Sequence, residues 1–134
     1  ASRTQSITAR GQDDLPCAVA RKLLGEDYLI GVSAHNPAEA KAALQSGADY
    51  LGCGAVFGTA TKADVEKLGT DGLAAICKAK GLPVVGIGGV TADNYREVRA
   101  AGADGAAIVS GILAQPDIRA TVKAIARISS EFAK

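Results

Sequence analysis

Short apolar runs alternate along the chain with longer segments in which apolar residues recur at helical spacing. The clearest run is LPVVGIGG at residues 82–89, which is rich in β-branched side chains and ends in glycines. Runs of this kind are typical of strands that are buried on both faces of a parallel sheet. Similar runs predict strands at residues 28–33, 49–53 and 106–109, and a short strand at most at residues 6–9.

Helix-start and helix-stop signals fill the intervals between these runs. Asn36, Pro37 and Glu39 together predict an N-cap, a first-turn proline and a capping-box acid. The first expected helix is capped by Asp13 or Asp14, has Pro16 in its first turn and ends at Gly25. The others run from Asn36 to Gly47, over residues 71–80, from a start signal at Thr91 and Asn94 to Gly102, and onward from Asp117. The apolar stripes expected to face the core are Leu15, Val19 and Leu23 in the first helix, Leu73, Ile76 and Cys77 in the third, and Ile118, Val122, Ile125 and Phe132 in the last.

The order of strand, glycine turn, capped helix and next strand indicates an α/β protein with a parallel sheet. SGADYLGCGAVFG from residue 46 and AGADGAAIVSGIL from residue 101 repeat one pattern: helix end, Gly-Ala-Asp, buried strand and glycine turn. A regular (β/α) repeat with right-handed crossovers is the simplest architecture. Four or five strands fit either a small open sheet or the later half of a (β/α)8 barrel, since a complete barrel needs at least about 200 residues. We expect an irregular segment, residues 1–10, and one partial-barrel domain, residues 11–134.

Composition and charge narrow the class of protein. Hydrophobic residues make up 48% of the chain, aromatics only 4%, and Met and Trp are absent, so the core is expected to consist of Ala, Val, Ile and Leu. The net charge of +1 gives no electrostatic case for nucleic acid or an anionic membrane. No apolar run approaches the roughly 20 residues that a membrane span needs.

The cysteines and the first residues bear on the compartment. Cys17, Cys53 and Cys77 form no CxxC pair, so we interpret them as small, reduced core residues of an intracellular protein. A cytoplasmic location follows from that interpretation. An organelle such as a plastid is the alternative, because the opening ASRTQSITAR has two arginines, several hydroxyls and no acid.

Glycine-rich turns follow the two last predicted strands. Gly88 and Gly89 end the first of these strands, and Val109, Ser110 and Gly111 follow the second. Where a strand's carboxyl end meets a helix's amino end, backbone N–H groups are free and an anion is favoured. The two turns are therefore a candidate phosphate cradle. Glycine turns required by packing alone, and a helix cap at Ser110, are the alternatives.

A long segment follows the 49–53 strand and carries Thr59-Ala60-Thr61-Lys62. Its length points to function rather than to a bare connection. Two hydroxyl groups and one ammonium group in four residues suit phosphate oxygens. A solvated polar loop is the alternative reading.

Three further residues carry candidate chemistry. Asp14 has the carboxylate that Mg²⁺ prefers, or else it caps the first helix. Ser33 and His35 lie at the carboxyl end of the 28–33 strand. His35 is either an acid or base, or a hydrogen-bonded structural residue. We find no Ser/His/Asp triad order, zinc-ligand spacing or Walker motif.

Several stretches together resemble thiamine-phosphate synthases. They are GQDDLP (11–16), IGVSAH (30–35), GADYLGCGAVFGTATK (47–62), LPVVGIGGV (82–90) and GADGAAIVSGI (102–112), in the family's order and spacing. The resemblance runs from about Gly11 to the end and implies the later portion of a (β/α)8 TIM barrel. It also implies a transferase of thiamine biosynthesis that uses Mg²⁺. Such an enzyme joins a hydroxymethylpyrimidine diphosphate to a thiazole phosphate, releasing pyrophosphate and giving thiamine phosphate.

The resemblance assigns roles to the candidate residues. Asp14 is implied as a Mg²⁺ ligand. Ser33 and Lys62 are implied as the catalytic residues that hold the pyrimidine diphosphate. The residues implied to hold the thiazole phosphate are Thr59, Ala60, Thr61, Gly89, Val109 and Ser110. Positioning and electrostatics carry a reaction of this type, and no protein nucleophile is required.

Two other functions stay open. One is a catalytically inactive half-barrel that serves as a binding or structural subunit, because open sheet edges leave unpaired strands and favour association. A second copy or a partner chain would then complete the barrel. The other is a thiazole tautomerase-like barrel that uses His35. Lys62 argues against it, since that reaction needs no diphosphate-binding lysine.

Overall fold

A computed structural model describes residues 5–9, 16–58, 67–79 and 81–133 of the chain. Five parallel strands form one sheet, in which each strand pairs with its neighbours in sequence. The strands are β1 (Gln5–Ala9), β2 (Tyr28–Ser33), β3 (Tyr50–Cys53), β4 (Val84–Ile87) and β5 (Gly105–Ala107). The helices are α1 (Cys17–Leu24), α2 (Pro37–Gln45), α3 (Gly69–Lys78), α4 (Tyr95–Ala100), α5 (Ser110–Leu113) and α6 (Ile118–Glu131).

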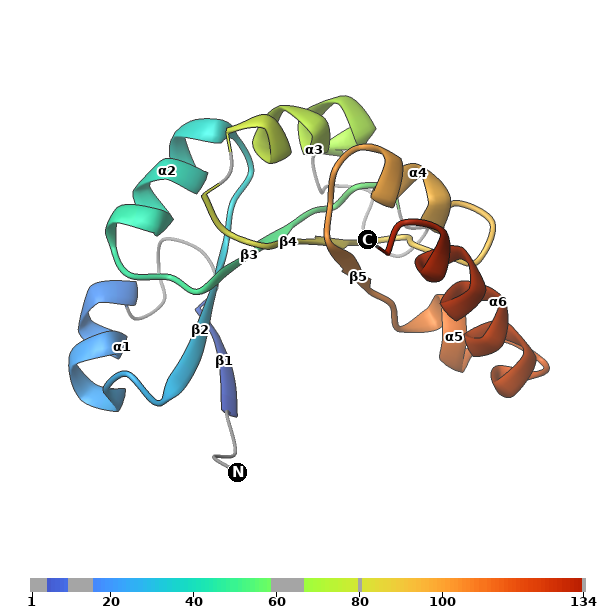
Figure 1. Ribbon diagram of the computed structural model, residues 1–134, viewed down its shortest axis with the longest axis horizontal. Coiled ribbons are helices and arrows are strands. Elements are labelled where there is room, and N and C mark those ends of the chain that lie inside the picture. Colours follow the sequence, from blue (N-terminus) through green and yellow to red (C-terminus); the bar gives the residue numbers. More distant parts are fainter. Residues whose placement is uncertain (1–4, 10–15, 59–66, 80, 134) are drawn as a thin grey trace.

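The strand order β1-β2-β3-β4-β5 decides between the two expected architectures. Crossovers between neighbouring parallel strands are right-handed, so a sheet that grows in one direction carries its helices on one face. A doubly wound open sheet reverses its strand order at a switch point instead. In Figure 1, α1, α2, α3 and α4 follow one another along the convex side of a curved sheet. The chain therefore forms an arc of a TIM-type (β/α) barrel.

The main core lies between the sheet and these helices. Ile30 of β2, Leu51 of β3 and Val84 of β4 are fully buried, and they belong to one apolar cluster with Leu73 and Ile76 of α3. Their alternate neighbours along each strand point to the other face. Most side chains of this cluster are the Ala, Val, Ile and Leu that the composition predicted, and Tyr95 and the three cysteines also belong to it.

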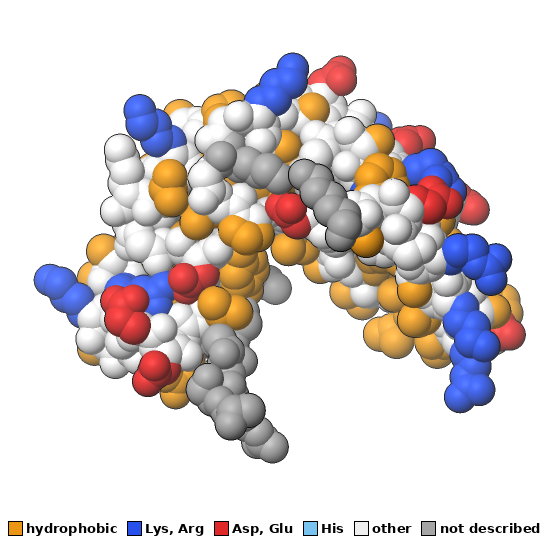
Figure 2. All heavy atoms as spheres, in the orientation of Figure 1, with side chains coloured by type: hydrophobic (Ala, Val, Ile, Leu, Met, Phe, Trp, Pro, Cys, Tyr) orange, Lys and Arg blue, Asp and Glu red, His pale blue; other side chains and the backbone are white. Residues whose placement is uncertain are grey.

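The concave face of the sheet is an apolar surface. Leu29 and Ile87 lie on this face by strand alternation, and each is 41% exposed. The ring of Tyr50 lies over Gly31, where a Cβ would come within 2.2 Å of the ring. Hydrophobic atoms gather along the hollow between the two arms of the arc in Figure 2. In a complete barrel this face fills the interior with packed side chains.

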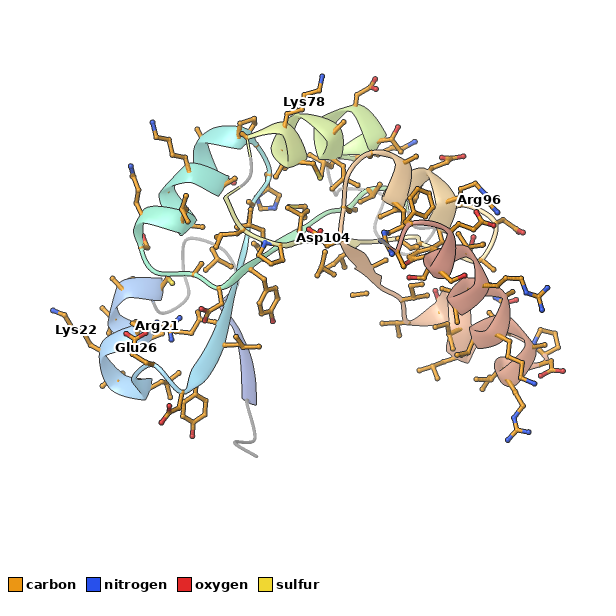
Figure 3. The ribbon with its side chains drawn as sticks, viewed as in Figure 1. Arg21, Lys22, Glu26, Lys78, Arg96 and Asp104 are labelled. Carbon is orange, nitrogen blue, oxygen red and sulfur yellow. The ribbon has the colours of Figure 1, made fainter. Side chains whose placement is uncertain are left out.

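The Gly-Ala-Asp repeat is a clamp between neighbouring strands. Asp49 donates its backbone N–H to the Ile30 carbonyl at 2.7 Å, and its Oδ2 accepts the Ile30 N–H at 2.8 Å. Asp104 makes the same pair of bonds to Val84, at 2.8 and 2.9 Å. Figure 3 labels Asp104 where the chain enters β5. The internal repeat that the sequence contains is thus a structural device at the entry to β3 and β5.

Arg21 of α1 reinforces the first of these clamps. Its guanidinium pairs with Asp49 and also donates to the carbonyl oxygens of Gly25, Tyr28 and Gly47. Burial alone would raise the pKa of Asp49. The Ile30 N–H and the Arg21 guanidinium outweigh that effect and hold the pKa of Asp49 below its ordinary value.

The stripe predicted for the first helix is wrong at Val19 and Leu23, and its third member, Leu15, lies outside the described residues. Val19 is 41% exposed and Leu23 is 73% exposed, whereas Cys17 and Ala20 face the core. Periodicity defines an apolar face but does not say whether that face meets the sheet or a neighbouring element. Residues 6–9, expected to form a short strand at most, lie in the strand β1, which pairs with β2 in parallel register.

The last helix begins as predicted but is buried less than predicted. Asp117 caps α6, since its Oδ1 accepts the Ala120 N–H at 3.0 Å. Ile125 packs against the core, but Ile118 and Val122 are 45% and 44% exposed. The four-residue helix α5 was indicated only by the alternative of a helix cap at Ser110, because a single turn has no periodicity to detect.

Cys17, Cys53 and Cys77 are all buried and form no disulfide, as the sequence indicated. In the described part of the chain, every helix is either too short or too polar to cross a bilayer.

Candidate functional site

The carboxyl ends of the strands meet at one edge of the sheet because all pairings are parallel. Ser33 at the end of β2 is in register with Gly52 of β3, and Ile87 at the end of β4 is in register with Ala107 of β5. The turns that follow β4 and β5 therefore leave the sheet side by side. This edge is where (β/α) barrels carry their functional groups.

The segment after β3 packs directly on the glycine turn after β4. Val56 donates its N–H to the Ile87 carbonyl at 2.9 Å, and Phe57 donates its N–H to the Gly88 carbonyl at 3.0 Å. Gly88 and Gly89 have φ values of 99° and 68°. A Cβ at Gly89 would lie 2.9 Å from the Phe57 carbonyl oxygen. Both glycines are thus required by packing and by backbone conformation.

The side chain of Asn94 closes the same turn from the other side. Its Nδ2 donates to the Gly89 carbonyl at 2.9 Å, and its Oδ1 accepts the Thr91 N–H at 2.7 Å. Thr91 and Asn94 were predicted only to start a helix, and α4 does begin directly after Asn94. The contact to Gly89 could not be read from the sequence.

The turn after β5 touches the turn after β4. A Cβ at Gly111 would lie 2.2 Å from the Val90 carbonyl oxygen and 3.1 Å from Thr91 Cα. Val109 is 72% exposed, and Ser110 is also exposed. Ser110 is the first residue of α5 and Val109 is the N-cap, so the interpretation of Ser110 as a helix cap is wrong. The structure thus places the turn that contains Val109 and Ser110 against the turn that contains Gly89.

Ser33 and His35 follow β2 at the same edge but differ in surroundings. Ser33 is half-buried. The His35 side chain is 59% exposed, and its Nδ1 lies 3.0 Å from Glu39 Oε2. The His35 backbone N–H donates to the same oxygen at 2.9 Å. Asn36 caps α2 as predicted, through the Glu39 N–H. His35 therefore belongs to the start of α2, which agrees with the interpretation of His35 as a hydrogen-bonded structural residue.

Cys53 at the end of β3 is not a nucleophile. Burial, the largest cause, raises the pKa of its thiol to about 12. The thiolate that would attack a substrate is therefore scarce at neutral pH. The chemistry of the described edge is that of backbone N–H groups and hydroxyls.

Several predicted residues lie outside the described part of the chain. They are Asp14, Thr59, Ala60, Thr61 and Lys62. Gly58 is the last described residue before Thr59, and its carbonyl oxygen lies 3.2 Å from the position of a Cβ on Gly89. Within the described ranges, no three or more His, Cys, Asp or Glu side chains gather as a metal site.

Comparisons with known proteins place the sequence motifs in context. The sequence profile of the thiamine monophosphate synthase family matches residues 10–112. The thiamine-phosphate synthase of Chloroflexus aurantiacus is 47% identical over 121 residues, 90% of this chain and 56% of its own. That of Moorella thermoacetica is 45% identical over 119 residues, 88% of this chain and 57% of its own. The chain spans little more than half the length of these relatives.

Solved structures give the same picture. The thiamine phosphate pyrophosphorylase of Pyrococcus furiosus superposes with a TM-score of 0.84 at 34% identity, covering 98% of this chain and 61% of its own. The 3-hexulose-6-phosphate synthase of Salmonella typhimurium superposes with a TM-score of 0.74 at 21% identity, covering 96% of this chain and 63% of its own. The second likeness concerns the fold alone.

Proposed function

The chain belongs to the thiamine monophosphate synthase family, and from this premise we propose that it forms part of a transferase of thiamine biosynthesis. The enzyme joins a hydroxymethylpyrimidine diphosphate to a thiazole phosphate, releasing pyrophosphate and giving thiamine phosphate. Family membership and the geometry at the carboxyl edge of the sheet support this assignment.

The contact between the turns after β4 and β5 carries the proposal. Gly111 lies against the Val90 carbonyl, so the turns after β4 and β5 are in contact at the carboxyl edge of the sheet. Barrel enzymes frequently bind a phosphate group between two such neighbouring turns. Helix amino ends add a partial positive charge at this point.

We assign the two substrates to the two sides of this edge. Gly89, Val109 and Ser110 bind the thiazole phosphate. Thr59, Ala60 and Thr61 add to that site, since Thr59 follows directly on Gly58, which lies beside Gly89. Ser33 and Lys62 bind the pyrimidine diphosphate.

The chemistry requires charge to leave with the diphosphate. The bond between the pyrimidine methylene carbon and the diphosphate oxygen breaks, and its electron pair leaves with pyrophosphate. The thiazole nitrogen lone pair then forms the new C–N bond. The positive charge of Lys62 stabilises the negative charge that develops on the departing pyrophosphate. The remaining contribution of the protein is to hold the nitrogen and the carbon within reach of each other.

Mg²⁺ is proposed on the chemistry of the diphosphate and of Asp14. This ion is commonly held by one or two carboxylates together with substrate phosphates. Among the described residues no three or more His, Cys, Asp or Glu side chains gather, and Asp14 lies outside them.

Two alternatives are weaker. A tautomerase using His35 is disfavoured by the exposed pairing of that side chain with Glu39. A non-catalytic binding subunit would keep the phosphate cradle but lack turnover. For the transferase and for the binding subunit alike, the remaining strands and helices of a barrel, or a second copy of the chain, would cover the apolar concave face. The cytoplasmic or organellar location stays a prediction.

Product formation tests the function. The wild-type chain is incubated with both phosphorylated precursors and Mg²⁺, and thiamine phosphate and pyrophosphate are measured. Lys62→Ala is expected to lose about a hundredfold or more in rate, the usual scale for a group that stabilises developing charge. Lys67→Ala, an exposed lysine of the same segment, is the matched control and keeps its rate. Equal activity in both variants, or none in the wild type, would overturn the assignment.

A further inference from the structure

The geometry points to Asn94 as a positioning residue that holds the turn at Gly88 and Gly89 in its anion-binding form. This inference rests on the proposed function and deepens it. Asn94 is the N-cap residue of α4, yet its side chain makes no capping hydrogen bond into that helix. Its Oδ1 reaches back to the Thr91 N–H at 2.7 Å, and its Nδ2 donates to the Gly89 carbonyl at 2.9 Å.

The chain's other asparagine shows what ordinary capping looks like. Asn36 has extended backbone angles, and its Oδ1 accepts the N–H of Glu39, three residues ahead. Asn94 has helical backbone angles, and its side chain is directed to residues that precede it. Helix capping accounts for Asn36. The Tyr95 N–H donates to the Thr91 carbonyl, so the bond from the Thr91 N–H to Asn94 Oδ1 matches the return bond of a capping box. The bond from Asn94 Nδ2 to the Gly89 carbonyl, in contrast, is no part of helix capping.

Three successive carbonyl groups of the turn are held by donors. Val56 N–H holds the Ile87 carbonyl, Phe57 N–H holds the Gly88 carbonyl, and Asn94 Nδ2 holds the Gly89 carbonyl. A carbonyl oxygen carries partial negative charge and repels a phosphate, so an anion site needs these groups turned away from it.

Because the peptide unit is planar, a hydrogen bond that holds a carbonyl group also sets the direction of the next residue's N–H group. In a trans peptide the carbonyl and the following N–H point in opposite directions. Fixing the Gly88 carbonyl therefore fixes the Gly89 N–H, and fixing the Gly89 carbonyl fixes the Val90 N–H. Gly88 and Gly89 adopt positive φ here, but because glycine has no Cβ it can adopt many other backbone conformations as well. Of the three donors, only that of Asn94 belongs to a side chain.

The variant Asn94→Asp removes one of the two hydrogen bonds of this side chain and keeps the other. The carboxylate keeps an oxygen for the Thr91 N–H but has no donor for the Gly89 carbonyl, and it brings negative charge to that carbonyl. We expect the affinity for thiazole phosphate, measured by calorimetric titration, to fall about tenfold or more, since small misplacements of binding groups cost this much. The affinity for the pyrimidine diphosphate should stay within about twofold. Asn36→Asp, the matched control, should leave both affinities unchanged.

The outcomes separate this inference from the proposed function. If the wild type forms product and Asn94→Asp binds thiazole phosphate like wild type, the positioning role is wrong and the function stands. Equal losses for both substrates would also overturn it, since they indicate general destabilisation. A wild type that binds neither substrate overturns both. Should the variant not fold, amide NMR of the wild type decides. Thiazole phosphate should shift the Gly89 and Val90 amides and slow exchange of the Asn94 side-chain amide, and their silence would refute the role.

Discussion

Gly111→Ala adds one methyl group at the point where the turn after β5 touches the turn after β4. The new Cβ would lie 2.2 Å from the Val90 carbonyl oxygen, 2.9 Å from Ile108 Cγ2 and 3.1 Å from Thr91 Cα. Two of these three atoms belong to the backbone, so a change of rotamer cannot relieve the contact. The two turns must move apart.

The size of the effect follows from these distances. Carbon and oxygen atoms have to separate by about 1 Å more before the contact with Val90 becomes tolerable. Overpacking of this kind costs about 1–3 kcal/mol of folding free energy. A displacement of about 1 Å between groups that bind one phosphate costs up to about a hundredfold in activity. We therefore expect a moderate loss of stability and a large loss of thiazole phosphate binding.

Gly105→Ala is the matched control. It lies in β5, and a Cβ there meets nothing within 4 Å. Its stability should change by less than about 1 kcal/mol, because removing a glycine from a strand also restricts the unfolded chain. Urea unfolding gives the stability of each variant, and calorimetric titration with thiazole phosphate gives the affinity.

If Gly111→Ala binds thiazole phosphate as tightly as Gly105→Ala does, the contact between the two turns does not form the phosphate site. Retained affinity together with lost stability would mean that the contact serves folding alone. Unchanged stability and affinity would mean that the turns are not in contact in solution.

Two further predictions concern the clamp and the concave face. Asp49→Asn should lower the free energy of unfolding by about 1 kcal/mol at pH 7, since it removes the charge beside Arg21. The pKa of Asp49 is lower in the folded state than in the unfolded state. The ionised carboxylate therefore stabilises the folded protein fully at pH values above its unfolded pKa, about 3.9, and this stabilisation is lost as the pH falls through the lower folded pKa. Urea unfolding between pH 7 and pH 2 checks this, with exposed Asp27→Asn as control, and an undiminished deficit at pH 2 contradicts it. The exposed concave face should make the chain self-associate in sedimentation velocity runs. Leu29→Lys on that face should reduce the association and Leu44→Lys on the outer face should not, whereas a monomer at every concentration would contradict the prediction.

Local signals predicted the elements that neighbouring residues decide. β2 covers residues 28–33 as expected, Asn36 and Asp117 cap α2 and α6, and Gly25 and Gly47 follow helix ends. These features depend on side chains within a few residues of one another, so periodicity and capping chemistry are sufficient to find them. The Gly-Ala-Asp repeat was also visible, but its hydrogen bonds to the preceding strand were not.

Tertiary structure decided the features that depend on distant residues. Strand order made the sheet an arc of a barrel, and helix packing placed Cys17 and Ala20 of α1 against the core and left Leu23 exposed. The contacts of Asn94 with Gly89 and of Gly111 with Val90 arise only when β4 and β5 lie in register. The sequence by itself therefore determined the elements and the kind of chemistry at their ends. Only the packing of those elements could determine which ends meet, because the periodicity of apolar residues in one element does not show which other element packs against it.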